Sequence, residues 1–371
     1  MKVRYSYLEQ QFRHVDDLWD QLKEFVSTGE FTLGPPLAEF ERKFAELIGT
    51  THAVGVNSGT DAIKLSLRAL GIGNGDEVIT AANTFVATVG AIAELGAKPV
   101  FVDCDDTFCI NVEQIEAVIT DKTKAIVPVH FAGYMTDMRQ LVPLAEMYDL
   151  PIVEDACQAI LGAIDNKNAG TWGRTGAFSL HPLKNINVWA DGGVIVTNED
   201  ELARDLKLLR NHGLVDRDTV KINGYNSRLD TFQAVVGNWL LPKAKTIAKK
   251  RIENANYYDK HLSKIPQIKI PPRPKNQKIV YHLYVLFAER RDSLLKYCLK
   301  KGIEAKVHYP KPMYLQENLK NLKHKNGDFP ITDEHTKKII TFPCDQHLTL
   351  SQLKYVVKSV NKFYKKNQVF K

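Results

Sequence analysis

The amino-acid sequence predicts an α/β protein whose larger part is a seven-stranded, mostly parallel sheet flanked by helices. Three observations support this fold class. Short apolar runs of strand length alternate with amphipathic helical patterns over the first half of the chain. These runs are apolar throughout rather than alternating, which is typical of strands covered on both faces. The chain has 371 residues, more than one simple core needs, so a second domain is expected.

The elements are expected in the following order. Two amphipathic helices come first, at 15–26 and 37–48, and Gly49 ends the second. Strands and helices then alternate without a repeat or a low-complexity segment. The strands are expected at 53–56, 77–80, 99–103, 125–129, 151–155, 177–180 and 194–197.

The composition changes after a long helical region that ends near Lys250. The segment from Ile265 to Pro274 is rich in Pro and Lys, and we expect it to be the hinge into a smaller domain. Strands expected at 280–287 and 305–308, and helices at 293–301 and 351–364, make this an α+β unit. The sequence therefore predicts a large domain at 1–250 and a small C-terminal domain at 251–371.

Composition and charge disfavour several classes of protein. The net charge of +7 is scattered, whereas nucleic-acid binding would require a concentrated basic stripe. The five cysteines show no metal or redox spacing, so we expect free thiols in a reducing compartment and no metal site. The N-terminus lacks the apolar core of a signal peptide, and no apolar run has the length of a membrane span. We expect a cytoplasmic protein that binds neither nucleic acid nor membrane.

Polar residues follow several expected strands at the carboxyl end, where open parallel sheets bind ligands. The run from Ser58 to Asp61 lies where a strand turns into a helix, and Gly59 lets the backbone approach closely. Free N–H groups and the helix dipole make such a turn a phosphate site. An N-capped helix without a ligand fits the same pattern.

Three further residues at this edge carry polar groups suited to chemistry. Asp155 ends a buried strand, where a carboxylate is costly unless it faces a positive partner, although it could instead cap the following helix. Gln158 would lie on the same side if a helix begins there. Lys184 lies in a loop between two buried strands, where desolvation can lower its pKa and make it a Schiff-base nucleophile. An ordinary solvated lysine is the alternative.

A phosphate cradle, a carboxylate and a lysine are together what pyridoxal phosphate requires. The lysine bonds to the aldehyde of the cofactor, and the carboxylate keeps the ring nitrogen protonated. Phe85, which follows another strand, could stack on the ring or could simply pack in the core.

Five motifs in order resemble those of the DegT/DnrJ/StrS sugar aminotransferases, which are fold-type-I pyridoxal phosphate enzymes of the aspartate aminotransferase superfamily. Two shorter motifs, Gly34-Pro and Val307-His-Tyr-Pro, extend the resemblance over nearly the whole chain. The five motifs are Asn57-Ser-Gly-Thr-Asp-Ala, Glu154-Asp-Ala-Cys-Gln, Phe178-Ser-Leu-His-Pro-Leu-Lys-Asn, Asp191-Gly-Gly and Gly224-Tyr-Asn-Ser-Arg-Leu-Asp.

The resemblance implies a role for each matching position. Lys184 would form the Schiff base and move the proton, while Asp155 pairs with the pyridine nitrogen. Asn226 would reach the phosphate from the neighbouring subunit of a homodimer with a shared active site. Arg228 could bind the carboxylate of the amino donor or form a structural ion pair. The remaining cofactor contacts implied are Gln158 to the ring hydroxyl, Phe85 to the ring face, and Gly59, Thr60, Asp61 (through backbone groups) and Ser179 to the phosphate.

The implied activity is transfer of an amino group from an amino acid, L-glutamate, to a nucleotide-linked keto-sugar, in amino-sugar biosynthesis for a surface polysaccharide or a glycosylated metabolite. Two alternatives are the same chemistry on a sugar without a nucleotide, such as an oxidised octulosonate, and a non-catalytic regulatory relative that binds the cofactor. Relatives in which histidine replaces the lysine are 3-dehydratases, so Lys184 disfavours dehydration. A dehydrogenase is disfavoured because the first strand–turn lacks Gly-x-Gly-x-x-Gly.

The chain departs from its relatives just after the lysine. Many of them have a linker rich in Gly and Leu where this chain has Ile-Asn-Val-Trp-Ala at 186–190. Trp189 could shape the sugar pocket or pack at the subunit interface. A lone His or Tyr in such places is more often structural than catalytic. The other expected lining residues are His181, His282, Tyr284, His308 and Tyr309.

Overall fold

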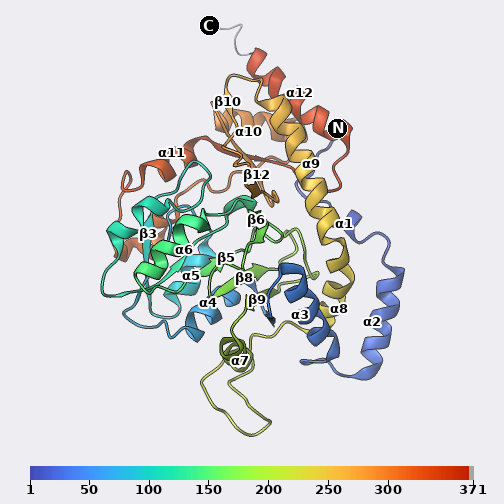
Figure 1. The fold of residues 1–371 in the computed structure, drawn as a ribbon. Helices are drawn as coiled ribbons and strands as arrows, with labels where there is room; N and C mark the ends of the chain where they lie inside the picture. The colour runs from blue at the N-terminus through green and yellow to red at the C-terminus, as the bar shows by residue number, and fades with distance from the viewer. Residues whose placement is uncertain (367–371) are drawn as a thin grey trace.

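Two groups of hydrogen-bonded strands lie at the centre of the computed structural model, which describes residues 1–366 (Figure 1). Their orders are β1-β9-β8-β5 and β3-β2-β4. Parallel bridges from Ile126 to Ile152 and from Val129 to Asp155 connect β4 to β5. The bounds are β1 His52–Val56, β2 Glu77–Ala81, β3 Lys98–Val102, β4 Thr123–Val127, β5 Val153–Asp155, β8 Thr175–Ser179 and β9 Gly193–Thr197.

The strands are mostly parallel, as the sequence predicts. Strands β2, β3 and β4 pair in parallel, and so do β5 and β8. Strand β9 is the exception, because it runs antiparallel to both of its neighbours, β1 and β8. A loop rather than a crossover helix joins β8 to β9, and such a connection returns the chain in the opposite direction. Lys184 lies in this loop.

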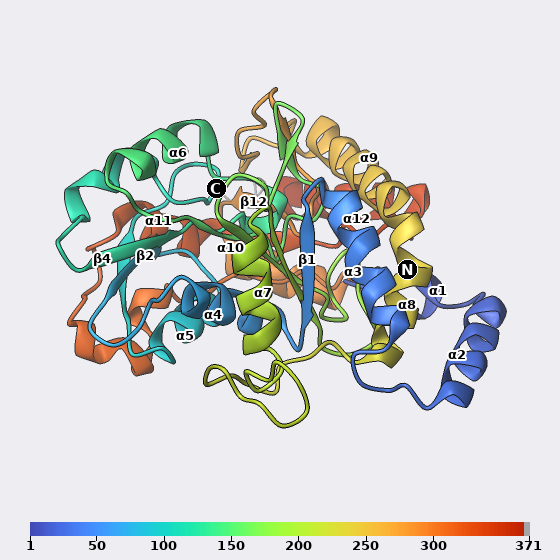
Figure 2. The ribbon, with the colours of Figure 1, turned by 60° about the horizontal axis from the view of Figure 1, so that its bottom comes forward.

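Helices cover both faces of the strands, which explains why the strands are apolar without alternation. In β2, Val78 packs in a cluster with side chains of α4, α5 and α7, whereas Ile79 packs on the other face with α3, α6 and α8. Figure 2 shows α7, with α4 and α5 nearby, on one side of β1 and α3 with α8 on the other. The bounds are α1 Leu8–Gln11, α2 Asp16–Thr28, α3 Pro35–Ile48, α4 Gly59–Ala69, α5 Val86–Ala93, α6 Met138–Met147, α7 Asp200–Leu209 and α8 Thr231–Leu240.

The C-terminal part forms a layer above the carboxyl ends of the central strands (Figure 1). Its sheet has the order β10-β12-β13. The bounds are β10 Ile268–Lys269, β12 Tyr284–Ala288, β13 Ile339–Phe342, α9 Ala244–Leu262, α10 Arg291–Lys300, α11 Pro330–Lys338 and α12 Leu350–Lys366. Three two-residue strands, β6 Ala163–Ile164, β7 Lys167–Asn168 and β11 Gln277–Lys278, form a further small sheet.

The prediction of a strand at 305–308 is wrong. Of these residues, only Lys306 pairs with a strand, in a single antiparallel bridge to Thr341 of β13. The following residues lie at the cavity described below, and Pro310 has no N–H to continue a ladder.

The division into domains at 250 and 251 stays a prediction. Helix α9 runs across that point, and the N-terminal segment packs with the C-terminal layer. Val3 pairs with Ile303 in a parallel bridge, and both side chains are buried in the core of that layer. Residues 367–371 of the predicted C-terminal domain lie outside the described residues.

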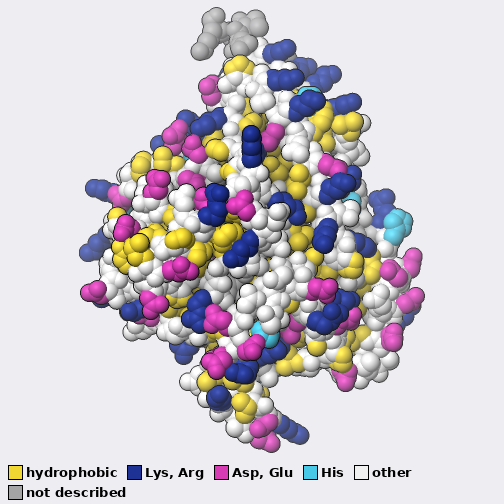
Figure 3. Space-filling model, in the orientation of Figure 1, with side chains coloured by type: hydrophobic (Ala, Val, Ile, Leu, Met, Phe, Trp, Pro, Cys, Tyr) yellow, Lys and Arg dark blue, Asp and Glu magenta, His cyan; other side chains and the backbone are white. Residues whose placement is uncertain are grey.

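The surface shows no basic stripe on the face drawn in Figure 3, where Lys and Arg are interspersed with Asp and Glu. Within residues 1–366, no helix combines the length and the apolar character that crossing a membrane requires. All five cysteines are free.

Candidate active site

A cavity of about 420 Å³ lies where the carboxyl ends of β1, β5 and β8 meet the C-terminal layer. It brings together most of the residues that the sequence singled out, although they come from segments far apart in the chain. The predicted residues that line it are Gly59, Thr60, Phe85, Asp155, Gln158, Ser179, His181, Lys184, His282, His308 and Tyr309.

The N-terminus of α4 forms one wall of the cavity. Ser58 caps the helix by accepting the N–H of Asp61 at 3.1 Å. The N–H groups of Gly59 and Thr60 begin the helix and have no carbonyl within it to bond, so they are free to hold an anion. The hydroxyls of Thr60 and Ser179 line the same wall. These donors fit a phosphate group.

A glycine is required at the first position of α4. A Cβ on Gly59 would lie 2.7 Å from the Cβ of Ser179 and 2.9 Å from the Sγ of Cys157. Helix α4 therefore starts in direct contact with the end of β8. This contact places the free N–H groups beside the loop that carries Lys184.

Asp61 lies outside the cavity, unlike its predicted neighbours. Its N–H bonds Ser58, and its carboxylate pairs with Lys64 at 2.9 Å and accepts the hydroxyl of Ser227 at 2.7 Å. These contacts give Asp61 a structural part in holding α4 and the segment around Ser227 together.

Asp155 faces the cavity from the end of β5 and is 6% exposed. Its Oδ2 accepts the hydroxyl of Thr88 at 2.8 Å, and its Oδ1 accepts the N–H of Cys157 at 3.2 Å. Across residues 1–366, no Lys, Arg or His forms an ion pair with this carboxylate. A buried carboxylate held only by neutral donors is suited to a cationic partner inside the cavity.

Glu154 points to the opposite face of β5, and sequence reasoning missed its role. This carboxylate is fully buried and accepts the N–H groups of Gly170, Trp172 and Gly173 at 2.6–2.8 Å. His130 Nε2 lies 2.9 Å from it. The sequence did contain a signal for this role. Glu154 and Asp155 are adjacent in a buried strand, and because successive residues of a strand face opposite sides, only one of them can face the cavity. Glu154 fixes the strand that presents Asp155.

Lys184 is partly buried on the floor of the cavity. Burial lowers the pKa of its ammonium group, while the neighbouring Cys157 and Asp155 act in the opposite direction. The ends of its loop are joined, since Leu180 donates to the carbonyl of Gly192 at 2.8 Å. Within the loop, the N–H of Lys184 donates to the carbonyl of His181 at 2.8 Å and closes a turn. A lysine held this way, with a lowered pKa, can act as a nucleophile.

Gln158 lies beside Asp155 through a turn and not on a helix, which corrects the expected local structure. Its Oε1 accepts the N–H of Ala132 at 2.7 Å. Across the cavity, Phe85 is 47% exposed, and its ring lies 5.7 Å from that of Tyr309. Phe85 therefore presents an aromatic face to the cavity rather than packing in the core.

Both histidines that the C-terminal layer contributes to this cavity are neutral near neutral pH. Burial, with Lys306 and Lys184 adding to it, lowers the pKa of His308 to about 4, and its Nδ1 lies 2.9 Å from the hydroxyl of Thr341. Burial also lowers the pKa of His282 well below its ordinary value, and its Nδ1 is buried without a partner among the described residues.

Four other predicted residues lie outside the cavity of their own chain. Trp189 packs against Phe12 and Trp19. Arg228 donates to the side chain of Asn211 at 2.9 Å and forms no ion pair among the described residues, so its binding of a donor carboxylate stays a prediction. Asn226 is exposed, and Tyr284 is fully buried with its hydroxyl 2.7 Å from Asp259.

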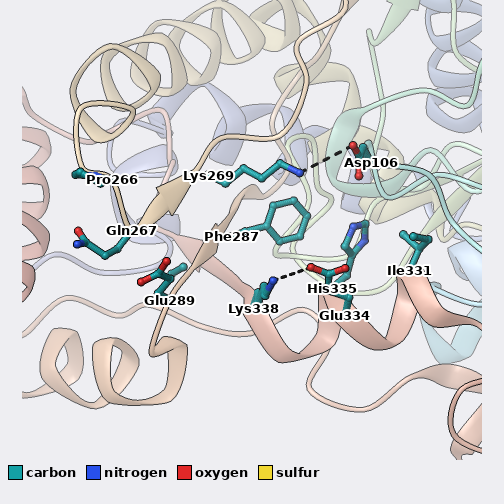
Figure 4. Close-up of a pocket in the computed structure, with 11 residues that line it drawn as sticks. Asp106, Pro266, Gln267, Lys269, Phe287, Glu289, Ile331, Glu334, His335 and Lys338 are labelled. Atoms are coloured by element: carbon teal, nitrogen blue, oxygen red, sulfur yellow. Dashed lines mark hydrogen bonds and ion pairs between the residues drawn. The ribbon is translucent and has the colours of Figure 1, made fainter.

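A second, smaller cavity of about 180 Å³ lies between α11 and the β10–β12 edge (Figure 4). Its lysines are already paired, Lys338 with Glu334 at 2.6 Å and Lys269 with Asp106 at 4.0 Å. His335 lines it, and burial lowers its pKa to about 4. No comparable set of reactive groups meets there among the described residues, which also contain no cluster of metal-binding side chains.

Residues 14–361 match the DegT/DnrJ/EryC1/StrS aminotransferase family. The chain belongs to this family. The resemblance seen in the sequence motifs is thereby confirmed, and with it dependence on pyridoxal phosphate and an aminotransferase activity.

Three curated relatives are each 36% identical. A pleiotropic regulatory protein of Geobacillus stearothermophilus aligns over 98% of this chain and 99% of its own. A dTDP-3-amino-3,4,6-trideoxy-alpha-D-glucose transaminase of Streptomyces venezuelae aligns over 91% and 89%. A UDP-N-acetyl-3-dehydro-alpha-D-glucosamine 3-aminotransferase of Acidithiobacillus ferrooxidans aligns over 91% of each chain.

Solved structures of aminotransferases have the same fold. DesV of S. venezuelae superimposes with a TM-score of 0.95 at 34% identity, over 98% of each chain. NtdA of Bacillus subtilis, solved with the cofactor in its amine form, pyridoxamine phosphate, gives a TM-score of 0.92 at 30% identity, over 98% of this chain and 85% of its own. The fold-type-I architecture predicted from the sequence is confirmed.

Proposed function

We propose that this aminotransferase moves the amino group of L-glutamate onto the ketone of a nucleotide-linked sugar. The observation that carries the proposal is the convergence of Lys184, Asp155 and the start of α4 on one cavity. The names of the dTDP- and UDP-sugar relatives supply the substrate class. A cytoplasmic location is part of the same proposal.

The cavity residues fit the cofactor by their chemistry. The N–H groups of Gly59 and Thr60, with the hydroxyl of Ser179, match a phosphate. Asp155 matches a protonated ring nitrogen, because it is buried with neutral partners only. Phe85 matches the ring face. Bound there, pyridoxal phosphate supplies an aldehyde that bonds amines and a ring that withdraws electrons from the attached carbon.

Lys184 would perform the proton transfers. Its lowered pKa increases the share of neutral amine available to bond the cofactor. When the donor replaces it, Lys184 Nζ takes the proton from the α-carbon of the amino acid and returns it at the next step. Asp155 holds its negative charge in place throughout, because Thr88 and Cys157 fix both of its oxygens.

Three of the expected substrate residues keep their role in this proposal. His181, His308 and Tyr309 line the cavity beyond Lys184, where the sugar would lie. Since His308 is neutral near neutral pH, it can orient a sugar hydroxyl but contributes no charge.

A homodimer with a shared site is part of this proposal. Asn226 is exposed at the base of an arm, residues 212–225, that projects from the end of α7 (Figures 1 and 2). The arm carries exposed Val215 and Val220. Exposed apolar side chains on a projecting segment favour contact with another chain. Asn226 can then reach the phosphate site of the partner.

Trp189 supports the same interface. It lies in an aromatic cluster in which Trp19 is 49% exposed and Phe232 is 39% exposed. Because this cluster lies outside the cavity, it favours packing against a partner over shaping the sugar pocket of its own chain.

The rival function is regulatory, as in the name of the Geobacillus relative. Purified protein given pyridoxal phosphate should turn yellow, with a band that borohydride abolishes. Lys184→Ala should never gain the band, whereas the surface variant Lys311→Ala should. L-glutamate should then convert the cofactor to its amine form, and a nucleotide-linked keto-sugar should restore the band. A wild type that gains no band refutes the cofactor site. A band that no amino acid alters favours the regulatory function.

A further inference from the structure

Lys306 is an exposed cation at the rim of the active-site cavity. Across residues 1–366, it forms no ion pair, although Asp155 and Asp191 line the same cavity. Lys184 is the other lysine that lines it, and the proposed chemistry occupies that amine. Among the residues that the structure describes, Lys306 is therefore the free ammonium group that the cavity offers to a substrate.

The backbone fixes where this side chain begins. The N–H of Lys306 donates to the carbonyl of Thr341 at 3.0 Å, and the N–H of Thr341 donates back at 2.8 Å. This exchange anchors Lys306 beside β13. Its stem consequently leaves the sheet edge at a defined position above the cavity.

An aromatic ring holds the ammonium group without neutralising it. Lys306 Nζ lies 4.1 Å from the ring centroid of Tyr5, which also lines the cavity. The N-terminal segment is itself anchored, since the N–H of Tyr5 donates to Glu304 at 2.9 Å. A cation over an aromatic face keeps its charge and its donors for another partner.

Neighbouring cationic groups cannot replace Lys306. His308, next to Tyr5, is neutral near neutral pH. Arg251 is buried, with an ion pair to Asp345 at 3.8 Å and hydrogen bonds to the carbonyls of Tyr281 and His282. Both proposed substrates are anions, a dicarboxylic amino acid and a sugar diphosphate, so the cavity must balance negative charge.

We propose that Lys306, held over Tyr5, binds the anionic oxygens of a substrate in this cavity. The inference rests on the proposed function, which supplies two sources of such oxygens, the carboxylate of the donor and the phosphates of the acceptor. Lys306 sets affinity and not the proton-transfer chemistry, because Lys184 performs the latter.

Calorimetric titration of the cofactor-loaded protein tests this without turnover. The probes are glutarate, an unreactive dicarboxylate, and thymidine diphosphate. The variants are Lys306→Met, which keeps the stem, Lys306→Arg, which keeps the charge, and Lys311→Met, an exposed lysine nearby that does not line the cavity. We expect Lys306→Met to lower the affinity for one of the two probes about tenfold or more, because a hydrogen bond from a charged group is lost. The affinity of Lys306→Arg for the probes should stay within about threefold of the wild-type affinity, and that of Lys311→Met should equal it.

The pattern identifies the source of the anion. Weakened thymidine diphosphate binding assigns Lys306 to the acceptor phosphates, and weakened glutarate binding assigns it to the donor carboxylate. Unchanged affinity for both probes, in a Lys306→Met protein that keeps the yellow band and the melting temperature, overturns the inference. A wild-type protein that binds neither probe overturns the inference as well. Failure of the proposed function would be seen separately, as a band that no amino acid converts.

Discussion

At the scale of single residues, the site depends on how one buried carboxylate is held. Asp155 forms no ion pair with a Lys, Arg or His among the described residues, and its orientation comes from Thr88 on α5 and the backbone of Cys157. Thr88 is in turn fixed by Thr84, whose hydroxyl lies 2.7 Å away. The two neutral donors, Thr88 and Cys157, fix the orientation of the carboxylate toward the cavity.

Thr88→Val tests this arrangement. The variant keeps the shape of the side chain but removes the hydroxyl that donates to Asp155. We expect kcat to fall about tenfold, because a hydrogen bond to a charged group is lost and the carboxylate is less well oriented. Steady-state kinetics with L-glutamate and a nucleotide-linked keto-sugar would measure this fall in kcat.

The matched control is Thr80→Val. Thr80 is equally buried, but its hydroxyl donates to the carbonyl of Val127 at 2.8 Å and does not contact Asp155. Thr80→Val should lower the melting temperature about as much as Thr88→Val does, while leaving kcat near the wild-type value. Equal losses of kcat in both variants would contradict a specific role for Thr88.

At the scale of elements, the site depends on the contact between α4 and the end of β8. The first turn of α4 supplies the free N–H groups, and β8 leads into the loop of Lys184. Gly193, at the start of β9, is also in close contact, since a Cβ there would lie 2.2 Å from the carbonyl oxygen of Ser58. Small residues thus let a helix start and two strands meet at one point.

Gly59→Ala should separate these elements. The added methyl group would overlap Ser179 and Cys157, which forces α4 away from β8 and displaces the phosphate donors. We expect the affinity for pyridoxal phosphate to fall about tenfold or more, with a loss of about 1–3 kcal/mol in unfolding free energy.

Spectral titration of the apoprotein with the cofactor, and a thermal melt, measure the two effects. Gly73→Ala is the control, because a Cβ at Gly73 would contact nothing within 4 Å. A Gly59→Ala protein that binds the cofactor as tightly as the wild type would refute the role given to this contact.

At the scale of the whole molecule, the cavity is built from both ends of the chain. The central strands and the segments that follow them supply the predicted cofactor residues, the C-terminal layer supplies His282, His308 and Tyr309, and the N-terminal segment supplies Tyr5. Asn226 and Trp189 lie outside this cavity, which is why a second copy enters the proposal.

Mixing Lys184→Ala with Asn226→Ala subunits tests the shared site. In a mixed dimer, one site receives Lys184 from one chain and Asn226 from the other, so it is intact. Random exchange should restore about a quarter of wild-type activity, since half the dimers are mixed and each has one intact site. Activity no higher than that of the separate variants would show that Asn226 acts within its own chain.

The sequence alone predicted much of the site because its chemistry is local. A glycine between a strand and a helix, a carboxylate ending a buried strand and a lysine between two strands can each be recognised within a few residues. The apolar strands and the Gly49 helix end were likewise confirmed, since strand burial and helix termination depend on short patterns.

Other features required the folded chain, because they depend on residues far apart in sequence. Asp61 was expected in the cavity, but Ser58, Lys64 and Ser227 engage it elsewhere. Trp189 contacts helix α2, more than 160 positions earlier in the sequence.

By itself, the sequence determined the fold class and the family, and it predicted the roles of Lys184 and Asp155, because periodicity and short motifs specify the former and suggest the latter. The tertiary structure decided the direction of β9, the partners of Asp155 and the position of Lys306 over Tyr5 at the rim of the cavity. These depend on contacts between distant segments, and no local pattern encodes which distant side chain will lie opposite.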